Sequence, residues 1–474
     1  MTEIITGLNL STVELLTVLA AFALVVARWL PAVARPRVTV AAGAVFLASA
    51  IALCATGIRW QLLPVLAGAV VVAPFAFFSL VRGGRARWWL ALPGSVACVG
   101  LIAAGPVATW AFPVPAFPEL TGDFAVGTRV LQWTDPERPE TFTAVPDDRR
   151  TVVAQLWYPA LSSPDAPRAQ YLGRTEDEAR TVSSALAAGV GLPGFLLDGA
   201  VCARTHAVPD APVAAAGGRF PVVLFSPGSS GVRSQNTAWA EELASHGYVV
   251  AALDHPYDSA AVVLADGRTI TTATVSSGDR DTDDKLGDEW TAIRAADLSF
   301  VLTRLEGLER GDPLAGRLDT GRVAATGHSM GGAAALQAAR LDHRIDAVID
   351  LDGYPRGPLS PALDQPTLAL TQAVTPDTDP RYLPQLTEVL TRGTATNYRL
   401  TIPGAAHLTF MDGPLYLPPV PSIVGSLGRE ESPHVVAAST LVFLDSVLRN
   451  GSSDLASALS AYGELSVFRP GNGR

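Results

Sequence analysis

The sequence predicts an α/β fold, in which helices cover both faces of a mainly parallel sheet, preceded by four membrane-spanning helices. Three observations support this prediction. The chain has 474 residues, which is room for more than one domain. Its mean hydropathy is positive and 48% of its residues are hydrophobic, which is high for a purely soluble protein of this size. Beyond residue 120, strand-like and helix-like stretches alternate along the chain.

Four apolar stretches fill most of the first 112 residues. Each reaches or approaches the ~20 residues that a helix needs to cross ~30 Å of hydrocarbon, and none has the polar face of a soluble core helix. They cover about Thr12–Leu30, Val38–Ile58, Leu62–Val81 and Trp88–Phe112. We therefore expect residues 1–112 to form a four-span transmembrane region. A cleaved signal peptide is not favoured, because the first stretch lacks a basic leader.

Arginines predict the orientation of this region. The loops after the first and third stretches are rich in arginine, with Arg28, Arg35 and Arg37 in one and Arg82, Arg85 and Arg87 in the other, whereas the second loop has only Arg59. Loops rich in Lys and Arg usually stay in the cytoplasm. The N-terminus and everything after the fourth stretch are therefore expected on the outer face of the cell membrane, opposite the cytoplasm.

The remainder of the chain has a different charge. Residues 1–118 carry seven arginines and two glutamates, whereas residues 119–474 carry 28 basic and 43 acidic residues. This acidic balance argues against a nucleic-acid partner, which would need a basic surface to contact phosphates. The three cysteines are too few for a disulfide framework, and Cys202 lacks the surroundings of a nucleophile.

Prolines at 113, 115 and 118 predict a stiff linker over residues 113–120, and a second domain over residues 121–474. Strand-like runs are expected at Thr151–Tyr158, Val222–Phe225, Tyr248–Ala252, Val323–Thr326, Ala347–Leu351, Thr367–Leu370 and Tyr398–Ile402. Helices are expected at Gln235–Ser245, Glu289–Glu306, Met330–Leu341 and His434–Leu448. Alternation of apolar strands with helices indicates a mainly parallel sheet covered on both faces.

An acidic stretch, Ser277–Asp288, raises the question of a metal site. Asp279, Asp281 and Asp283 match the first three ligand positions of an EF-hand loop. Asp284 stands where that loop needs glycine, and Trp290 where it needs the bidentate glutamate. A solvated loop is therefore favoured, and no metal is expected.

The motif Gly327-His328-Ser329-Met330-Gly331-Gly332 fits the G-x-S-x-G nucleophile elbow of the α/β-hydrolase fold. It lies between the strand-like run that ends at Thr326 and an alanine-rich helix, which is the context that this motif requires. A sharp turn there exposes the Ser329 hydroxyl at the helix N-terminus, where the dipole and the Met330 amide stabilise a developing oxyanion. Ser329 is the predicted nucleophile.

A serine nucleophile needs a histidine base within hydrogen-bond reach. His407 is the best placed of the seven histidines, because it follows the run Tyr398–Ile402 in a loop where the last strand of this architecture delivers its base. The acid is expected to be Asp352, directly after the run Ala347–Leu351. Asp377 and Asp379, in the loop after the next strand, remain the alternatives.

A second oxyanion donor is expected from the loop Phe225-Ser226-Pro227-Gly228-Ser229-Ser230, which follows an early central strand. The amide of Ser229 is the candidate. A plain Pro-Gly turn without a catalytic role is the alternative reading of this loop.

These residues resemble the plasma-type platelet-activating factor acetylhydrolases and their bacterial relatives. The likeness runs from Gln155-Leu156-Trp157-Tyr158-Pro159 to His407, with Phe410 and Asp412 behind it. It includes Phe225-Ser226-Pro227-Gly228, the run from Leu243 to Ala252, the elbow and Leu351-Asp352-Gly353. The resemblance implies Asp352 as the acid and the Ser229 amide as the second oxyanion donor. One departure is Pro227-Gly228, where the family usually has His-Gly, and the four-span region lies outside the likeness.

The resemblance also implies ester hydrolysis through an acyl-enzyme, without metal or cofactor, on small-molecule or lipid esters. We therefore expect a membrane-anchored serine ester hydrolase whose catalytic domain lies outside the cytoplasm. Two alternatives stay open at this stage. An envelope acyltransferase would use the same triad and pass the acyl group to an alcohol in place of water. A non-catalytic hydrolase-like sensor domain would be expected to lack a triad member, and none is missing here.

Overall fold

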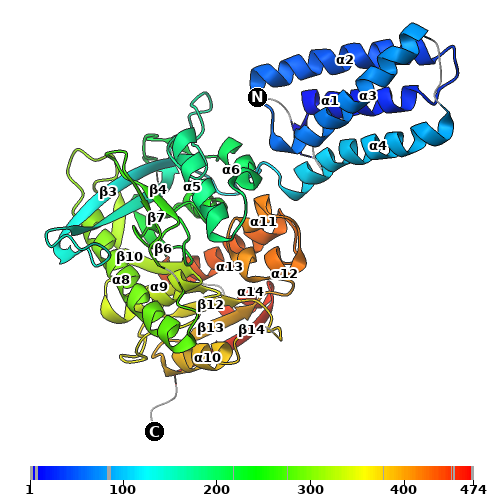
Figure 1. Cartoon of the computed structure of the whole chain (residues 1–474). Coiled ribbons are helices and arrows are strands. Elements are labelled where there is room, and N and C mark those ends of the chain that lie inside the picture. The colour runs from blue at the N-terminus through cyan, green and yellow to red at the C-terminus, as the bar shows by residue number, and fades with distance from the viewer. Residues whose placement is uncertain are drawn as a thin grey trace. The chain divides into compact units, whose positions relative to one another are not determined.

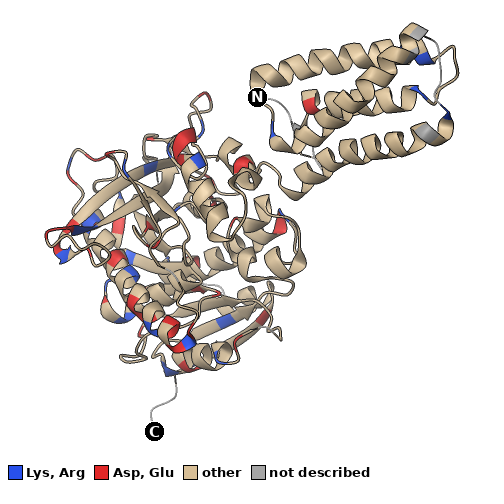
Figure 2. Cartoon of the chain, viewed as in Figure 1, with Lys and Arg blue, Asp and Glu red and all other residues tan. Residues whose placement is uncertain are grey.

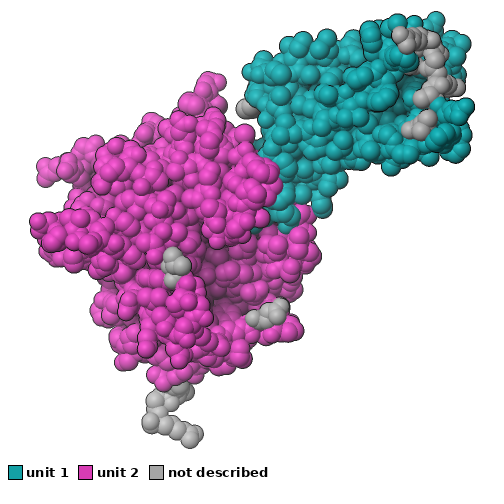
Figure 3. Space-filling model, in the orientation of Figure 1, with its two compact units in different colours: residues 1–114, 416–418 teal, residues 115–415, 419–474 magenta. Residues whose placement is uncertain are grey.

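A computed structural model describes residues 4–5, 9–82, 87–216, 218–274, 276–376, 378–449, 451 and 454–470. The chain divides into two compact units (Figures 1 and 3). The first, here called the helical unit, contains Met1–Val114 and Tyr416–Pro418. The second, here called the sheet unit, contains Pro115–Leu415 and Pro419–Arg474.

The helical unit is built from long apolar helices that carry few charged residues (Figure 2). Its helices are α1 (Thr12–Ala27), α2 (Arg35–Thr56), α3 (Leu63–Arg82) and α4 (Trp88–Ala111), with the 3-10 turn η1 (Trp60–Leu62) before α3. Two short strands, β1 (Ile4–Ile5) and β2 (Leu10–Ser11), pair ahead of α1. Buried Val18, Val25, Leu53, Val65 and Ile102 belong to the core that joins the four helices.

The expectation of four membrane-spanning helices is wrong for the first of them. Among the described helices, three are long and apolar enough to cross a membrane, at Arg35–Thr56, Trp60–Phe78 and Ala91–Ala111. Helix α1 is apolar but has only 16 residues, or about 24 Å at 1.5 Å per residue. It begins at a capping box formed by Ser11 and Glu14 and ends before Pro31, so its apolar stretch is not helical to its end.

The sheet unit contains a ten-stranded sheet in the order β14-β13-β12-β11-β10-β6-β7-β4-β3-β5. The strands are β3 (Ala125–Pro139), β4 (Arg149–Ala160), β5 (Val208–Pro209), β6 (Phe220–Ser226), β7 (Val249–Asp254), β10 (Leu318–His328), β11 (Ala347–Leu351), β12 (Thr367–Thr371), β13 (Asn397–Thr401) and β14 (Glu464–Phe468). The central six strands, from β13 to β7, are parallel. The antiparallel pairs lie at the sides, at β13–β14, β4–β7 and β3–β4.

Helices cover both faces of this sheet, because alternate residues of each central strand are apolar and face opposite ways. Val222 and Leu224 of β6 pack in one core with α8 (Arg280–Glu306) and α9 (Met330–Leu341). Val223 and Phe225 of the same strand pack in the other core with α7 (Thr237–Ser245) and α13 (Glu431–Leu448). The predicted α/β-hydrolase architecture with a mainly parallel sheet is confirmed.

The other elements of the sheet unit are short or peripheral. They are α5 (Glu176–Gly189), η2 (Gly194–Leu197), α6 (Asp198–Cys202), β8 (Ala261–Val263), β9 (Thr269–Thr271), α10 (Tyr382–Arg392), η3 (His407–Phe410), α11 (Gly413–Tyr416), α12 (Pro421–Val424) and α14 (Leu455–Ser460). The interpretation of Ser277–Asp288 as a loop is wrong from Arg280 onward, where α8 begins. Asp279 caps that helix by accepting a hydrogen bond from the Thr282 amide at 2.9 Å.

The register of the parallel strands brings three chain segments to one edge of the sheet. His328, at the end of β10, pairs with Leu351 at the end of β11. Leu351 pairs with Leu370 of β12, and Thr371 of β12 pairs with Thr401 at the end of β13. The residues that follow β10, β11 and β13 therefore meet at the carboxyl edge, which is where open α/β sheets bind ligands.

Candidate active site

Ser329 occupies the turn between β10 and α9 with a strained backbone. Its φ is +56° and its ψ is −121°, a conformation that side-chain-bearing residues rarely adopt. The Ser329 amide donates to the Leu351 carbonyl at 2.9 Å, so the neighbouring strand helps to hold the turn. Ser329 remains partly exposed, although the five residues before Ser329 are buried.

Glycines around Ser329 allow backbone segments to approach more closely than any side chain permits. A Cβ on Gly331 would lie 1.9 Å from the Ser226 carbonyl oxygen, and a Cβ on Gly327 would lie 2.1 Å from the Gly331 carbonyl carbon. A Cβ on Gly332 would lie 1.9 Å from Asp350 Oδ1. These approaches, which only glycine can accommodate, bring the turn against the end of β6.

His407 and Asp352 are in direct contact at the carboxyl edge. His407 Nδ1 and Asp352 Oδ2 are 2.7 Å apart. The His407 side chain is 41% exposed, whereas that of Asp352 is 2% exposed. Within the described part of the chain, His407 Nε2 has no hydrogen-bond partner. A histidine held through Nδ1 by a buried carboxylate, with Nε2 open, is the arrangement of a general base.

Further contacts fix the Asp352 carboxylate. Oδ1 accepts hydrogen bonds from the Gln372 amide and the Tyr382 hydroxyl, both at 3.1 Å, and Oδ2 accepts one from Gln372 Nε2 at 3.0 Å. Burial, followed by the charge of Asp352, raises the pKa of Tyr382 well above its ordinary value, so this hydroxyl stays a donor. Of the alternative acids, Asp379 forms ion pairs with Arg280 and Arg381, and Asp377 lies outside the described residues.

A chain of hydrogen bonds connects the Ser226–Ser230 loop to His407 through His328. The Gly228 amide donates to Gln235 Oε1 at 3.1 Å, and Gln235 Nε2 lies 2.8 Å from His328 Nδ1. His328 Nε2 lies 3.0 Å from the His407 carbonyl oxygen, and the two imidazole rings are 4.5 Å apart between centroids. Burial, reinforced by the nearby His407, lowers the pKa of His328 to about 3. His328 is therefore neutral, donating from Nε2 and accepting at Nδ1.

The amides of Ser229 and Met330 are the predicted oxyanion donors. The loop lies against Ser329, since a Cβ on Gly228 would be 3.5 Å from Ser329 Cβ. The Gly228 amide is already bonded to Gln235, whereas the Ser229 amide has no acceptor among the described residues. Met330 is the first residue of α9, where helix amides lack partners in the preceding turn.

A buried arginine holds the carbonyls of this loop. Arg294 of α8 donates to the Pro227 carbonyl and, at 3.1 Å, to the Gly228 carbonyl. Its charge is balanced by Asp258, whose Oδ1 lies 2.7 Å from Arg294 Nη2. The Gly228 carbonyl and the Ser229 N–H belong to one planar peptide and point in opposite directions. Arg294 therefore aims the Ser229 amide away from itself.

A second serine, histidine and aspartate also form a hydrogen-bonded series, but it is closed to solvent. Ser226 Oγ lies 2.9 Å from His255 Nε2, and His255 Nδ1 lies 2.8 Å from Asp297 Oδ2. All three residues have no exposed surface. Although burial alone would raise it, Arg150 and His255 hold the pKa of Asp297 far below its usual range. This series supports the base of the Ser226–Ser230 loop, and no substrate can reach it.

Local sequence patterns do not reveal every residue that shapes the site. Gln235, Arg294, Gln372 and Tyr382 all contact predicted site residues or their loop, yet none belongs to the elbow, and only Gln372 directly follows a strand. Arg294 is one polar residue in a long helix, and Tyr382 begins helix α10, which the sequence interpretation missed. Only their three-dimensional contacts identify them.

Most of the sheet unit matches a known protein family. The family described as platelet-activating factor acetylhydrolase, isoform II, matches residues 111–449. A probable 1-alkyl-2-acetylglycerophosphocholine esterase of Arthroderma benhamiae is 28% identical over 250 residues, covering 50% of this chain and 58% of that protein. The platelet-activating factor acetylhydrolase of Cavia porcellus is 30% identical over 158 residues, covering 29% of this chain and 36% of that protein. The matches thus span less than two thirds of the length of each of these relatives.

A solved structure shares the fold more completely. The ferulic acid esterase from Streptomyces cinnamoneus is 29% identical, with a TM-score of 0.61, and the match covers 74% of this chain and 98% of that one. The family match starts at residue 111, so α1, α2, α3 and nearly all of α4 lie outside it.

The depressed pKa of His328 predicts how stability depends on pH. An unfolded chain takes up a proton at an ordinary histidine pKa near 6.5, whereas folded His328 does so only near 3. The contribution of this neutral, buried ring is therefore fully present above pH 6.5 and falls with pH, by about 3 kcal/mol at pH 4. Thermal unfolding between pH 7 and pH 4 should show a shallower decline for His328→Asn than for the wild type. His343→Asn, at an exposed histidine, is the matched control; an unchanged slope in His328→Asn would contradict the prediction.

Proposed function

This chain belongs to the platelet-activating factor acetylhydrolase, isoform II, family, and from that premise we propose that it is a serine ester hydrolase with Ser329 as nucleophile, His407 as base and Asp352 as acid. The observation that carries the proposal is the 2.7 Å contact between His407 and Asp352 at the same sheet edge as the strained Ser329 turn. The esterase names of the relatives support the same chemistry.

The proposed reaction begins with attack of Ser329 Oγ on the ester carbonyl while His407 Nε2 takes the hydroxyl proton. The Asp352 carboxylate holds the ring in the correct tautomer and stabilises the imidazolium. The amides of Ser229 and Met330 donate to the oxyanion of the tetrahedral intermediate. His407 then protonates the leaving alcohol, and a water molecule, deprotonated by the same ring, releases the acid from the acyl-enzyme.

In this mechanism Arg294 is a positioning residue. It touches neither the ester nor the nucleophile, but it holds the Pro227 and Gly228 carbonyls by hydrogen bonds. The Ser229 N–H belongs to the same peptide group as the Gly228 carbonyl and points the opposite way. A donor aimed before the substrate arrives costs no reorganisation in the transition state. Loss of this constraint should therefore lower kcat more than it raises KM.

The proposed substrates are carboxylic esters of lipids with short acyl groups. The name of the Arthroderma relative specifies an acetyl ester of a glycerophosphocholine, and that of the solved relative an ester of an aromatic acid. We propose the lipid class because the chain also carries apolar helices long enough to enter a membrane. Hydrolysis and transfer to an alcohol share the same acyl-enzyme, and the acceptor distinguishes them.

The helical unit, on this proposal, anchors the enzyme in the cell membrane with the sheet unit outside the cytoplasm. The arginine-rich ends of the helices would lie in the cytoplasm. Helix α1 has only 16 residues and is not required as a span: α2 would lead out of the cytoplasm, α3 back to it and α4 out again.

Ser329→Ala should abolish hydrolysis of p-nitrophenyl acetate and longer esters, and Asp352→Asn should lower kcat about 10⁴-fold because His407 loses its orienting carboxylate. Asp379→Asn is the matched control, since that carboxylate is occupied by Arg280 and Arg381. Initial rates and mass detection of the acyl-enzyme provide the readout. Hydrolysis that survives Ser329→Ala, or collapses only in Asp379→Asn, would refute the assignment.

Arg294→Lys should lower kcat by about 10²-fold, the usual effect of a lost oxyanion donor, with a smaller change in KM. Affinity for a trifluoromethyl ketone, which forms a tetrahedral oxyanion adduct with serine, should fall in parallel. Arg304→Lys, on the exposed face of the same helix, is the control. If Arg294 had a merely structural role, Arg294→Lys would lower the unfolding temperature, and the loss in kcat would not be matched by a parallel loss of affinity for the trifluoromethyl ketone.

Orientation is measurable with a cysteine probe that cannot cross membranes. In a variant without native cysteines, Ser162→Cys in the sheet unit should be labelled in intact cells. Ala32→Cys, in the turn between α1 and α2, should be labelled only after lysis. Both positions are exposed. The reverse pattern would place the sheet unit in the cytoplasm.

A further inference from the structure

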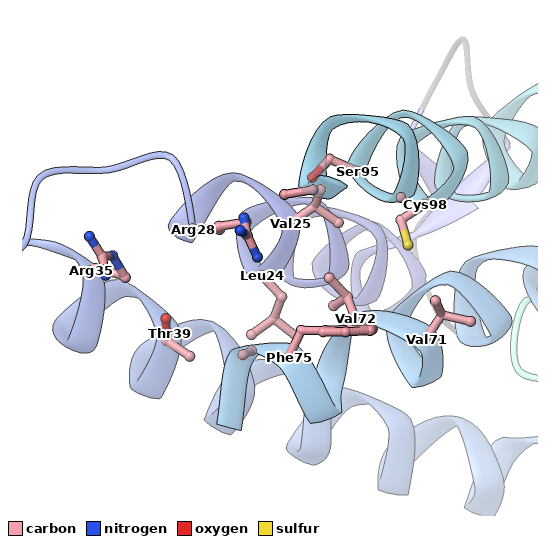
Figure 4. Close-up of a pocket in the computed structure, with 13 residues that line it drawn as sticks. Leu24, Val25, Arg28, Arg35, Thr39, Val71, Val72, Phe75, Ser95 and Cys98 are labelled. Atoms are coloured by element: carbon pink, nitrogen blue, oxygen red, sulfur yellow. The ribbon is translucent and has the colours of Figure 1, made fainter. Parts of the chain in front are cut away.

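The helical unit contains a cavity of about 210 Å³ that is lined by both apolar and basic side chains (Figure 4). Most of its wall is apolar. The lining residues are Leu24, Val25, Arg28, Arg35, Thr39, Val71, Val72, Phe75, Ala76, Ala91, Gly94, Ser95 and Cys98. They come from all four helices of the unit, and the described lining contains two arginines and no acidic residue.

Arg35 is the unusual member of this lining. It is only 9% exposed, and within the described residues its Nε has no hydrogen-bond partner and its guanidinium forms no ion pair. A guanidinium without a partner is costly to bury, and more so beside hydrocarbon. An anion bound in the cavity would remove that cost.

The backbone around Arg35 is also positive. Arg35 is the first residue of α2, a helix whose N-cap Ala34 supplies no side-chain hydrogen bond and whose first turn has no acidic residue. The N-terminus of a helix carries a partial positive charge, which favours anions and disfavours a neighbouring cation. The N-terminus of α2 and the Arg35 side chain would therefore both be stabilised by the same negatively charged group. Arg28 lines the same cavity.

We propose that this cavity binds an anionic phospholipid, with its phosphate at Arg35 and Arg28 and part of one acyl chain along the wall of Leu24, Val72 and Phe75. The proposal rests on the membrane anchoring proposed above but not on ester hydrolysis. On the orientation proposed there, this end of the bundle lies at the cytoplasmic leaflet, where anionic lipids meet basic pockets between helices. The site would make the enzyme selective for the lipid that surrounds its anchor.

The test uses the full chain purified in a mild detergent, titrated with phosphatidylglycerol or phosphatidylcholine and followed by native mass spectrometry. Wild-type protein should retain one phosphatidylglycerol at least about tenfold more tightly than phosphatidylcholine, as charge-assisted hydrogen bonds imply. Arg35→Gln should remove that preference. Arg37→Gln is the matched control, because Arg37 lies in the same helical turn and is exposed.

Three results would overturn the proposal. Equal losses in Arg35→Gln and Arg37→Gln would show that the charge of the bundle end, and not the cavity, selects the lipid. Displacement of the lipid by glycerol 3-phosphate at equal concentration would identify a small-anion site. Oleate binding as tightly as phosphatidylglycerol would identify a fatty-acid site. Hydrolysis of p-nitrophenyl acetate, measured on the same samples, should be equal in both variants, so that a failure of the esterase proposal is seen separately.

Discussion

The close approach of backbone to backbone beneath Ser329 is the constraint on which the site depends. A Cβ on Gly331 would meet the Ser226 carbonyl oxygen at 1.9 Å, so the turn and the end of β6 can pack together only because the residue is glycine. That approach brings the Ser226–Ser230 loop beside the nucleophile. It also leaves the Ser329 backbone in a strained conformation, which the hydrogen bond to Leu351 and the packing of α9 hold in place.

Buried charge maintains this arrangement where apolar packing could not. Arg294 and Asp258 pair in the interior, and the guanidinium also satisfies two loop carbonyls. A buried ion pair contributes little net stability compared with apolar packing, because both groups lose their hydration. What an arginine provides is several donors in a fixed plane, which orient peptide groups. The buried charge is thus explained by the geometry of the loop better than by the stability of the fold.

The sequence predicts those parts of the site whose chemistry is local. Ser329, His407 and Asp352 each follow a strand within a few residues, and parallel strands bring such positions to one edge, so patterns of apolar runs are enough to find them. Gln235 and Arg294 act across long separations in sequence and carry no local motif. The length of α1 was overestimated for a related reason: composition measures how apolar a stretch is, whereas Pro31 and the preceding turn decide where its helix ends.

Two titratable residues beside the proposed triad, His328 and Asp350, have pKa values that burial shifts toward the neutral form, and this bears on how the triad would work. Burial lowers the pKa of His328, and burial, followed by the charge of Asp352, raises the pKa of Asp350 well above its usual range. At neutral pH His328 is therefore uncharged. A charged His328 would repel the imidazolium of His407, with their rings 4.5 Å apart. A neutral His328 adds no such repulsion, so in the proposed mechanism the Asp352 carboxylate, 2.7 Å from His407 Nδ1, stabilises the imidazolium as the proton leaves Ser329.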